Sequence, residues 1–261
     1  MKIIVCIKQV PDTTEVKLDP KTGRLIRDGV PSIINPDDKN ALEEALRIKD
    51  ENPDTTVTVV SMGPPQADVA MREALAMGAD EAILISGREF GGSDTWATSY
   101  IIATAIKKIP DYDIIFCGRQ AIDGDTAQVR PQIAEQLNIP QITYVQKLDI
   151  EGDKVIVQRQ LEDGYTVVEA KMPVLLTAIK ELNTPRYMTP KVIFEAYNKT
   201  VQVWGFNDVP VDAEKIGLKG SPTNVNRTFS PEAKGKGIML EGADKETVKT
   251  LIAKLDEKHL L

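Results

Sequence analysis

The sequence predicts a doubly wound, mostly parallel α/β sheet of the Rossmann-like kind, with an antiparallel appendage and a C-terminal arm. Short apolar runs alternate with helical patterns as far as Pro140, as expected for a parallel sheet. A glycine-bearing turn leads from the apolar run 113–117 into a helical pattern at 127–137. After Pro140, apolar and polar residues alternate, which is typical of antiparallel strands. These three observations together indicate the fold class.

The elements follow in order along the chain. Residues 13–34 are polar and predict an excursion that carries a small hairpin. Apolar or alternating runs predict strands at 2–8, 57–62, 81–86, 113–117, 145–150, 154–161, 165–171 and 173–178. Apolar residues at helical spacing predict helices over 40–49, over a segment that ends at Met77, over 95–108 and over 127–137, and a last helix capped by Asp244.

Composition excludes several classes of function. The chain has 261 residues, 42% of them hydrophobic and 27% charged, which is ordinary for a globular protein. The net charge of −7 argues against nucleic acid as the main partner. No apolar run reaches the roughly 18 residues of a membrane span, and the N-terminus lacks a signal-peptide core. We therefore expect a cytoplasmic protein with no membrane insertion.

Catalytic side chains of the usual kinds are scarce. Cys6 and Cys117 lie far apart without a CxxC pattern, so neither a disulfide framework nor a zinc site is indicated. The only histidine, His259, is the third residue from the C-terminus, which makes Ser-His-Asp, Cys-His and HExxH sites implausible. We expect no metal and no catalytic side chain, so any redox chemistry would belong to a bound cofactor.

The loop from Cys117 to Val129 is the strongest candidate for a binding site. In open α/β sheets, a turn from the carboxyl end of a strand into a helix N-terminus is where nucleotides bind. Gly118 and Gly124 would let the backbone approach a ligand closely, Asp125 or Thr126 can cap the helix, and Arg119 is a cation for a phosphate. The alternative is a solvent-exposed Asp-Gly turn without a ligand.

Other strand ends and helix starts carry polar or polarisable residues with two interpretations. Asn35 or Asp37 can cap the helix that follows, and Asp94 can cap the helix in which Thr95 and Thr98 share a face. Cys6 and Met62 end apolar strands and read either as buried core residues or as nucleotide contacts.

The segment Gly-Arg-Gln-Ala-Ile-Asp-Gly-Asp-Thr-Ala-Gln at 118–128 resembles the nucleotide-binding segment of the small (β) subunit of electron-transfer flavoproteins. The form Asp-Gly-Asp-Thr-Ala-Gln-Val, with Asp-Thr-x-Ala-Thr at 94–98, resembles the electron-bifurcating and nitrogen-fixation-linked branch, in which the threonines line the pyrophosphate of a whole FAD. The resemblance implies cofactor binding by Cys6, Asn35, Asp38, Met62, Asp94, Thr95, Thr98, Gly118, Arg119, Gln120, Ala121, Asp123, Gly124, Asp125, Thr126, Ala127, Gln128 and Val129.

The segment 182–187 resembles the start of the recognition loop with which the family docks on partner dehydrogenases. Proline keeps such a segment extended, and the alternative is a stiff tether to the C-terminal part. Members that serve acyl-CoA dehydrogenases have a leucine at or beside the position of Pro190. Because this chain has proline there, the identity of its partner stays open. The residues expected to dock on a partner are Pro185, Arg186, Tyr187, Met188, Val192 and Ile193.

The resemblance implies a nucleotide- and flavin-binding domain at 1–195 and an arm with a helix at 196–261 that docks on a larger α subunit carrying its own FAD. The heterodimer would take a hydride from NADH. One electron would pass to ferredoxin or flavodoxin, and the other through the second FAD to a dehydrogenase, most simply of the acyl-CoA type. The alternatives are an ordinary small subunit that holds structural AMP, and an adenine-nucleotide sensor of the universal-stress kind.

Overall fold

The apolar runs lie side by side at the centre of a nine-stranded sheet in the computed structural model, which describes residues 1–12, 31–226, 235 and 237–261. The strand order is β11-β5-β4-β1-β6-β10-β7-β8-β9, parallel from β11 to β7 and antiparallel from β7 to β9. The strands are β1 (Lys2–Cys6), β4 (Thr56–Met62), β5 (Glu81–Ile85), β6 (Ile114–Gly118), β7 (Gln141–Glu151), β8 (Lys154–Gln160), β9 (Tyr165–Lys171), β10 (Val174–Ala178) and β11 (Val201–Trp204). The predicted fold class is confirmed.

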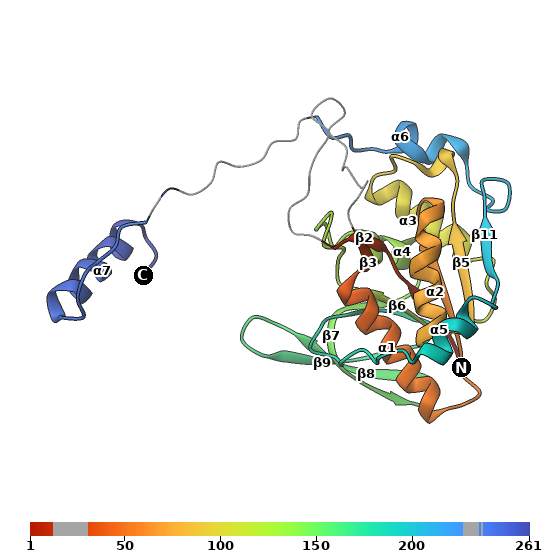
Figure 1. Cartoon of the computed structure of the whole chain (residues 1–261), viewed down its shortest axis with the longest axis horizontal. Helices are drawn as coiled ribbons and strands as arrows, with labels where there is room; N and C mark the ends of the chain where they lie inside the picture. The colour runs from red at the N-terminus through yellow and green to blue at the C-terminus, as the bar shows by residue number, and fades with distance from the viewer. Residues whose placement is uncertain (13–30, 227–234, 236) are drawn as a thin grey trace. The chain divides into compact units, whose positions relative to one another are not determined.

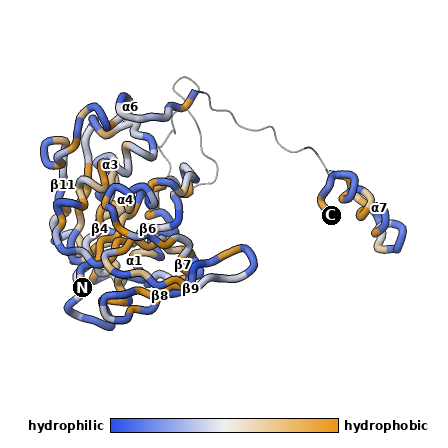
Figure 2. Tube along the Cα trace, turned by 180° about the vertical axis from the view of Figure 1, so that it is seen from behind, coloured by the Kyte–Doolittle hydropathy of each residue, from blue (hydrophilic) through white to orange (hydrophobic). Residues whose placement is uncertain are grey.

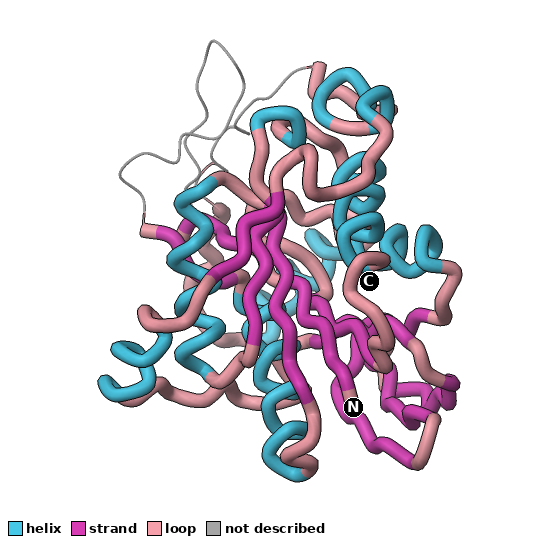
Figure 3. The backbone as a smooth tube through the Cα atoms, turned by 90° about the vertical axis from the view of Figure 1, so that its right-hand side faces the viewer, coloured by secondary structure: helices cyan, strands magenta, loops and turns pink. Residues whose placement is uncertain are grey.

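Helices cover both faces of the parallel strands, as Figure 3 shows. The helices are α1 (Pro36–Glu51), α2 (Asp68–Met77), α3 (Thr95–Ile106), α4 (Val129–Leu137), α5 (Pro190–Ala196), α6 (Gly217–Gly220) and α7 (Lys245–Glu257), with short 3-10 turns η1 (Pro65–Ala67), η2 (Arg88–Phe90) and η3 (Ala213–Lys215). Alternate residues of β1 face opposite sides: Ile3 and Val5 pack with α1 and α2, whereas Ile4 packs with α3 and α4. Burial on both faces explains the continuous apolar runs, seen along β4 and β6 in Figure 2.

The antiparallel appendage matches its prediction. Strands β7, β8 and β9 form a meander at one end of the sheet (Figure 1). Strand β2 (Gln9–Pro11), just before the predicted excursion, pairs antiparallel with β3 (Ser32–Ile34) at the end of it. The rest of that hairpin prediction lies in residues 13–30, outside the described part of the chain.

Helix boundaries differ most from expectation. Helix α1 begins at Pro36, four residues before the predicted start, because proline at the first helical position needs no N–H partner. Helix α5 was not predicted at all. Its seven residues carry a single buried side chain, Ala196, too little apolar periodicity to indicate a helix.

The chain divides into two compact units, Met1–Asn226 and Arg227–Leu261. Strand β11 pairs with β5 inside the first unit, so that unit continues beyond residue 195. In the second unit, Asp244 caps α7 by accepting from the N–H groups of Glu246 and Thr247 at 2.9 and 2.8 Å, which confirms the predicted cap. Val248, Leu251 and Ile252 on α7 are about half exposed, at 50, 47 and 50%. The assignment of 196–261 to subunit docking stays a prediction.

The order of β5, β4, β1 and β6 creates a reversal point in the sheet. From β1 the chain moves one way to β4 and β5, and then crosses to the other side of β1 to form β6. Open α/β sheets bind ligands outside the carboxyl ends of the strands at such a point. Cys6 and Cys117 lie opposite each other in the β1–β6 register, at this end of the strands. No helix among the described residues is long and apolar enough to cross a membrane.

Candidate nucleotide site

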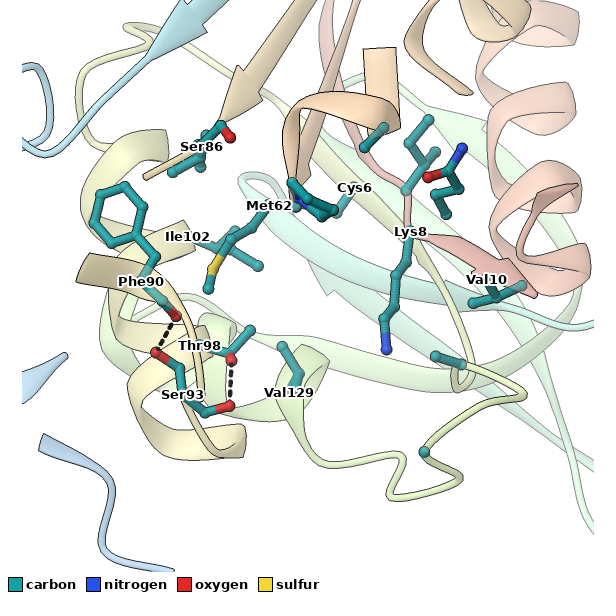
Figure 4. Close-up of a pocket in the computed structure, with 18 of the residues that line it drawn as sticks. Cys6, Lys8, Val10, Met62, Ser86, Phe90, Ser93, Thr98, Ile102 and Val129 are labelled. Carbon is teal, nitrogen blue, oxygen red and sulfur yellow. Dashed lines mark hydrogen bonds between the residues drawn. The ribbon is translucent and has the colours of Figure 1, made fainter. Parts of the chain in front are cut away.

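A cavity of about 1020 Å³ opens at the carboxyl ends of β1, β4, β5 and β6. Figure 4 shows side chains from all sides converging on it, among them Met62, Phe90, Thr98 and Val129. The predicted site residues that line it are Cys6, Met62, Asp94, Thr95, Thr98, Ala121, Gly124, Asp125, Thr126 and Val129. Its volume lies at the upper end of the roughly 300–1,000 Å³ typical of cofactor sites.

The remaining predicted site residues stand behind the wall rather than in it. The described residues that line the cavity do not include Asn35, Asp38, Gly118, Arg119, Gln120, Asp123, Ala127 and Gln128. Most of them hold the loop between β6 and α4 in place, as the hydrogen bonds described next show.

Asp38 joins the ends of the two central strands. Its carboxylate is fully buried and accepts from the backbone N–H of Lys8 and of Gly118, each at 2.9 Å. Arg130 Nη2 donates to the same carboxylate at 3.2 Å. Burial raises the pKa of Asp38, and Arg130 and the two N–H groups oppose that rise. One side chain of α1 therefore connects β1, β6 and α4.

Asn35 fixes the next part of the loop. Its side-chain nitrogen donates to the Gln120 carbonyl at 2.8 Å, and its side-chain oxygen accepts from the Ile122 N–H at 3.0 Å. Asn35 occupies the N-cap position of α1 without capping it, and Asp37 lies inside the helix. Asn35 thus holds the predicted cap position, but its amide holds the loop instead of bonding to the helix, and the alternative cap Asp37 is wrong.

Further contacts hold the loop on its other sides. Lys8 Nζ binds the Asp123 carboxylate at 2.7 Å, and the Arg119 N–H donates to the Ala178 carbonyl at 2.9 Å. Thr95 Oγ1 lies 3.1 Å from Gln128 Oε1 and joins the starts of α3 and α4. The loop is therefore built by protein contacts, from β1, β10 and α3 as well as from α1.

The backbone of the loop turns through the left-handed region twice. Asp125 has φ 55° and Ala127 has φ 53°. Left-handed conformations at non-glycine residues cost roughly 1–2 kcal/mol each and collect at ligand sites. Asp125 also binds the Gln120 side chain.

Helix α4 starts later than predicted. It begins at Val129, with Gln128 at the N-cap and no side-chain cap, so the prediction that Asp125 or Thr126 caps it is wrong. The left-handed Asp125 and Ala127 keep the chain out of the helix until Gln128. Pro131 then lies in the first turn, where a missing N–H is no loss.

The start of α3 matches its prediction. Asp94 caps the helix by accepting from the Ala97 N–H at 2.9 Å, and it also accepts from the N–H of Thr223 at 2.9 Å. Partial burial raises the pKa of Asp94, but the hydrogen bonds from Thr223 and Ala97 outweigh it and leave the pKa below its usual value. Asp94 is thus ionised, and its carboxylate is already hydrogen-bonded within the protein. Thr95 and Thr98 line the cavity beside it.

The Cys117 thiol behaves as a buried, protonated group. Cys117 is fully buried, and its hydrogen bond with Cys6 together with burial raises its pKa well above the usual range. Both line the cavity floor. The core interpretation thus holds for Cys117, and Cys6 combines partial burial with a place in the wall.

Arg130, and not Arg119, is the arginine that lines the cavity, in contrast to the sequence-based expectation for Arg119. Arg119 Nε lies 3.4 Å from Asp37 Oδ2, and its guanidinium lies 5.9 Å from the Tyr144 ring centroid. Arg130, which was not singled out, lines the cavity. Its position one residue past the loop, at the start of a helix, was the available signal. Lys8 also lines the cavity and was missed.

The predicted docking segment divides into an anchored and an exposed part. Arg186 donates from its backbone N–H and from Nε to Glu43 Oε2 at 3.0 and 2.9 Å, and its Nη2 reaches Asp50 at 2.8 Å. The hydrogen bonds to Glu43 raise the pKa of Arg186 further above its usual range. Tyr187 is fully exposed, whereas Pro185, Met188 and Val192 are half-buried and Ile193 is 38% exposed. Phe194, which was not predicted, is 76% exposed on α5.

Substituting Gly118 should destabilise the protein, because a Cβ there would come within 2.6 Å of the Asp37 carbonyl carbon. We expect Gly118→Ala to cost about 1–3 kcal/mol of unfolding free energy. Gly124→Ala is the control: a Cβ at Gly124 meets nothing within 4 Å, and its φ is not left-handed. Denaturant unfolding of both variants tests this, and equal effects would contradict the close approach of α1.

Arg186→Ala should lower the unfolding free energy by about 1–3 kcal/mol, because it leaves the Glu43 carboxylate, 6% exposed, without its partner. Tyr187→Ala, the next residue, should stay within about 0.5 kcal/mol because its side chain is fully exposed. Thermal melts of the two variants measure the difference. An unchanged melt for Arg186→Ala would show that the ion pair does not hold this segment.

Comparison with known proteins places the whole chain among relatives. The family model described as electron transfer flavoprotein domain matches residues 22–209. The chain is 59% identical over 261 residues to the electron transfer flavoprotein subunit beta of Clostridium acetobutylicum, with 100% of both chains covered. It is 58% identical to the caffeyl-CoA reductase-Etf complex subunit CarD of Acetobacterium woodii and 52% identical to the acryloyl-CoA reductase electron transfer subunit gamma of Anaerotignum propionicum, again with 100% of both chains covered.

Proposed function

Because this chain belongs to the electron transfer flavoprotein family, as a β subunit, we propose that it binds FAD in the cavity described above and serves an electron-bifurcating heterodimer. The FAD would accept a hydride from NADH. One electron would go to a low-potential acceptor such as ferredoxin or flavodoxin, and the other through the larger α subunit's FAD to a partner dehydrogenase. The residues of this chain would bind and orient the cofactor and exclude water from it.

The observation that carries the proposal is the extent of the cavity beyond an adenosine-sized recess. Its wall includes Cys6, Met62, Thr95 and Thr98 together with the apolar side chains of Phe90 and Ile102, and Figure 4 shows Met62, Ile102 and Phe90 near one another. AMP needs only a recess for one nucleoside and one phosphate, whereas FAD also needs room for a second phosphate and a flat apolar ring. A volume of about 1020 Å³ with apolar side chains in the wall suits the larger molecule.

The fit is supported by the chemistry of the wall. Hydroxyl groups and the first-turn N–H groups of α4, which have no side-chain cap, are donors suited to phosphate oxygens. Among the described residues, no group of three or more His, Cys, Asp or Glu side chains could hold a metal ion. A bound flavin would supply reversible two- and one-electron transfer.

The partner side of the proposal rests on α5 and the segment before it. Tyr187 and Phe194 are large apolar side chains at 100 and 76% exposure, the kind of residue that anchors interfaces. Arg186 holds this segment against α1. Two relatives carry the names of enoyl-type CoA reductase complexes, which supports a dehydrogenase of the acyl-CoA type as partner.

The arm at 196–261 is proposed to dock on the α subunit. Helix α7 has charged residues on one side and Val248, Leu251 and Ile252 on the other, an amphipathic pattern suited to a partner surface.

Flavin content tests the cofactor. The chain co-purified with its α subunit should contain two FAD per heterodimer, measured by absorbance after release. Thr95→Val with Thr98→Val should weaken this subunit's FAD by about 10-fold or more, since each lost hydrogen bond contributes about 1 kcal/mol.

Thr104→Val is the matched control for that pair, because its hydroxyl binds the Tyr100 carbonyl on the same helix. It should retain both FAD molecules. One FAD with AMP in the unmodified heterodimer would instead identify an ordinary small subunit, and bound ATP without flavin would identify a nucleotide sensor.

Coupling to the dehydrogenase tests the docking surface. Tyr187→Ala and Phe194→Ala should each raise the KM for the dehydrogenase by about 5-fold or more, since buried aromatic anchors contribute 1 kcal/mol or more. Their flavin content and NADH oxidation with an artificial acceptor should stay unchanged. Tyr165→Ala, another exposed tyrosine on β9, is the control. Equal coupling in all three variants would place the docking surface elsewhere.

A further inference from the structure

Arg130 is a charged side chain on the wall of the cavity with only 10% of its surface exposed. It is the second residue of α4, in the turn whose N–H groups have no side-chain cap. Long side chains in a first turn lie back toward the helix N-terminus, where the cavity is. A cation in this place interacts more strongly with an anion than an exposed one does, because little water screens it.

The Asp38 carboxylate, which is the partner of Arg130 in the protein, does not use all the hydrogen-bond donors of the guanidinium. A guanidinium has five N–H donors, and within the described residues one hydrogen bond is made, from Nη2 to Asp38 Oδ1 at 3.2 Å. Asp38 is itself divided among three donors, since it also accepts from the N–H groups of Lys8 and Gly118. Donors and positive charge of Arg130 are therefore left for a second anion.

The other charged groups of the cavity wall are either bound to groups of the protein or exposed to solvent. Lys8 is bound to Asp123, and Asp94 and Asp125 are hydrogen-bonded within the protein. Arg88 is exposed at the rim. Among the cationic side chains of the described lining residues, Arg130 is the buried one, and it lies next to the starts of α3 and α4. The Thr95–Gln128 hydrogen bond holds these two helix starts together.

We propose that Arg130 binds the diphosphate of the dinucleotide at the start of α4, sharing its guanidinium between Asp38 and a phosphate oxygen. This assignment rests on the proposed function and adds a residue that determines specificity for phosphate. Two planar N–H donors match two phosphate oxygens, and such charge-assisted bonds are stronger than those from hydroxyl groups. Arg130 thereby selects diphosphate-bearing ligands over nucleosides of the same base.

Calorimetric titration of three ligands tests the assignment. The full-length chain with its α subunit, freed of nucleotide by dialysis against concentrated bromide, is titrated with adenosine, AMP and ADP. In Arg130→Gln, ADP affinity should fall about 10- to 100-fold, as for loss of a charge-assisted hydrogen bond, while adenosine affinity changes less than about 3-fold. Arg130→Lys, which keeps the charge without the planar fork, should recover part of the loss.

Equal losses for adenosine and ADP would overturn the assignment, because they would show that Arg130 acts only by supporting Asp38 and the loop. Since Arg130→Gln leaves a buried carboxylate without its cation, the same titrations compare Asp38→Asn with Asp38→Asn/Arg130→Gln. A selective loss of ADP in the double variant supports the assignment, and no difference overturns it.

The proposed function has a separate readout in the same samples. If the unmodified heterodimer binds ADP but not FAD, the proposal of FAD fails and the assignment of Arg130 to the diphosphate stands. If it binds no adenine ligand, both fail.

Discussion

The buried carboxylate of Asp38 is the interaction on which the binding end of the sheet depends. It joins the strand end at Lys8, the strand end at Gly118 and the helix start at Arg130, which belong to three different elements. An isolated buried anion would be costly, and here two backbone N–H groups and a guanidinium offset that cost. Without it, the two central strands would lose a buried side chain that links their carboxyl ends, and the loop that follows β6 would lose its first anchor.

The close packing of α1 against the end of β6 also explains why residue 118 is a glycine. The first turn of α1 lies so close to the end of β6 that a Cβ at residue 118 would overlap the backbone of Asp37 and Asp38. The sequence suggested that this glycine makes room for a ligand, but the space is taken by α1. Gly124, by contrast, faces open space, as the sequence-based interpretation requires.

Much of the fold could be predicted because its signals are local. Continuous apolar runs reveal strands buried on both faces, alternation reveals the meander of β7 to β9, and the caps Asp94 and Asp244 accept N–H groups two or three residues away. The start of α4 could not be predicted in this way. It depends on the left-handed Asp125 and Ala127, in a loop whose preceding residues Ile122 and Asp123 are held by Asn35 and Lys8, which are distant in sequence.

The candidate site likewise has features that could be predicted from the sequence and features that could not. The loop was identified from its glycines and its place after a strand, and the starts of both helices were recognised as polar. Which arginine faces the cavity was not predictable, because Arg119 and Arg130 flank the same loop and are distinguished only by the carboxylates they meet, Asp37 and Asp38. Those two neighbours sit on a helix some eighty residues earlier in the chain. Side-chain direction at such a place is a property of the assembled tertiary structure.

The two left-handed residues of the loop have a kinetic consequence. The loop that contains them is held by protein contacts at Gln120 and Asp123, so a ligand that binds against the loop does not have to order all of its backbone. A pocket prepared in this way loses little entropy on association, and its affinity is expressed mainly as slow dissociation. Such a site suits a permanently retained prosthetic group better than a substrate that exchanges at every turnover.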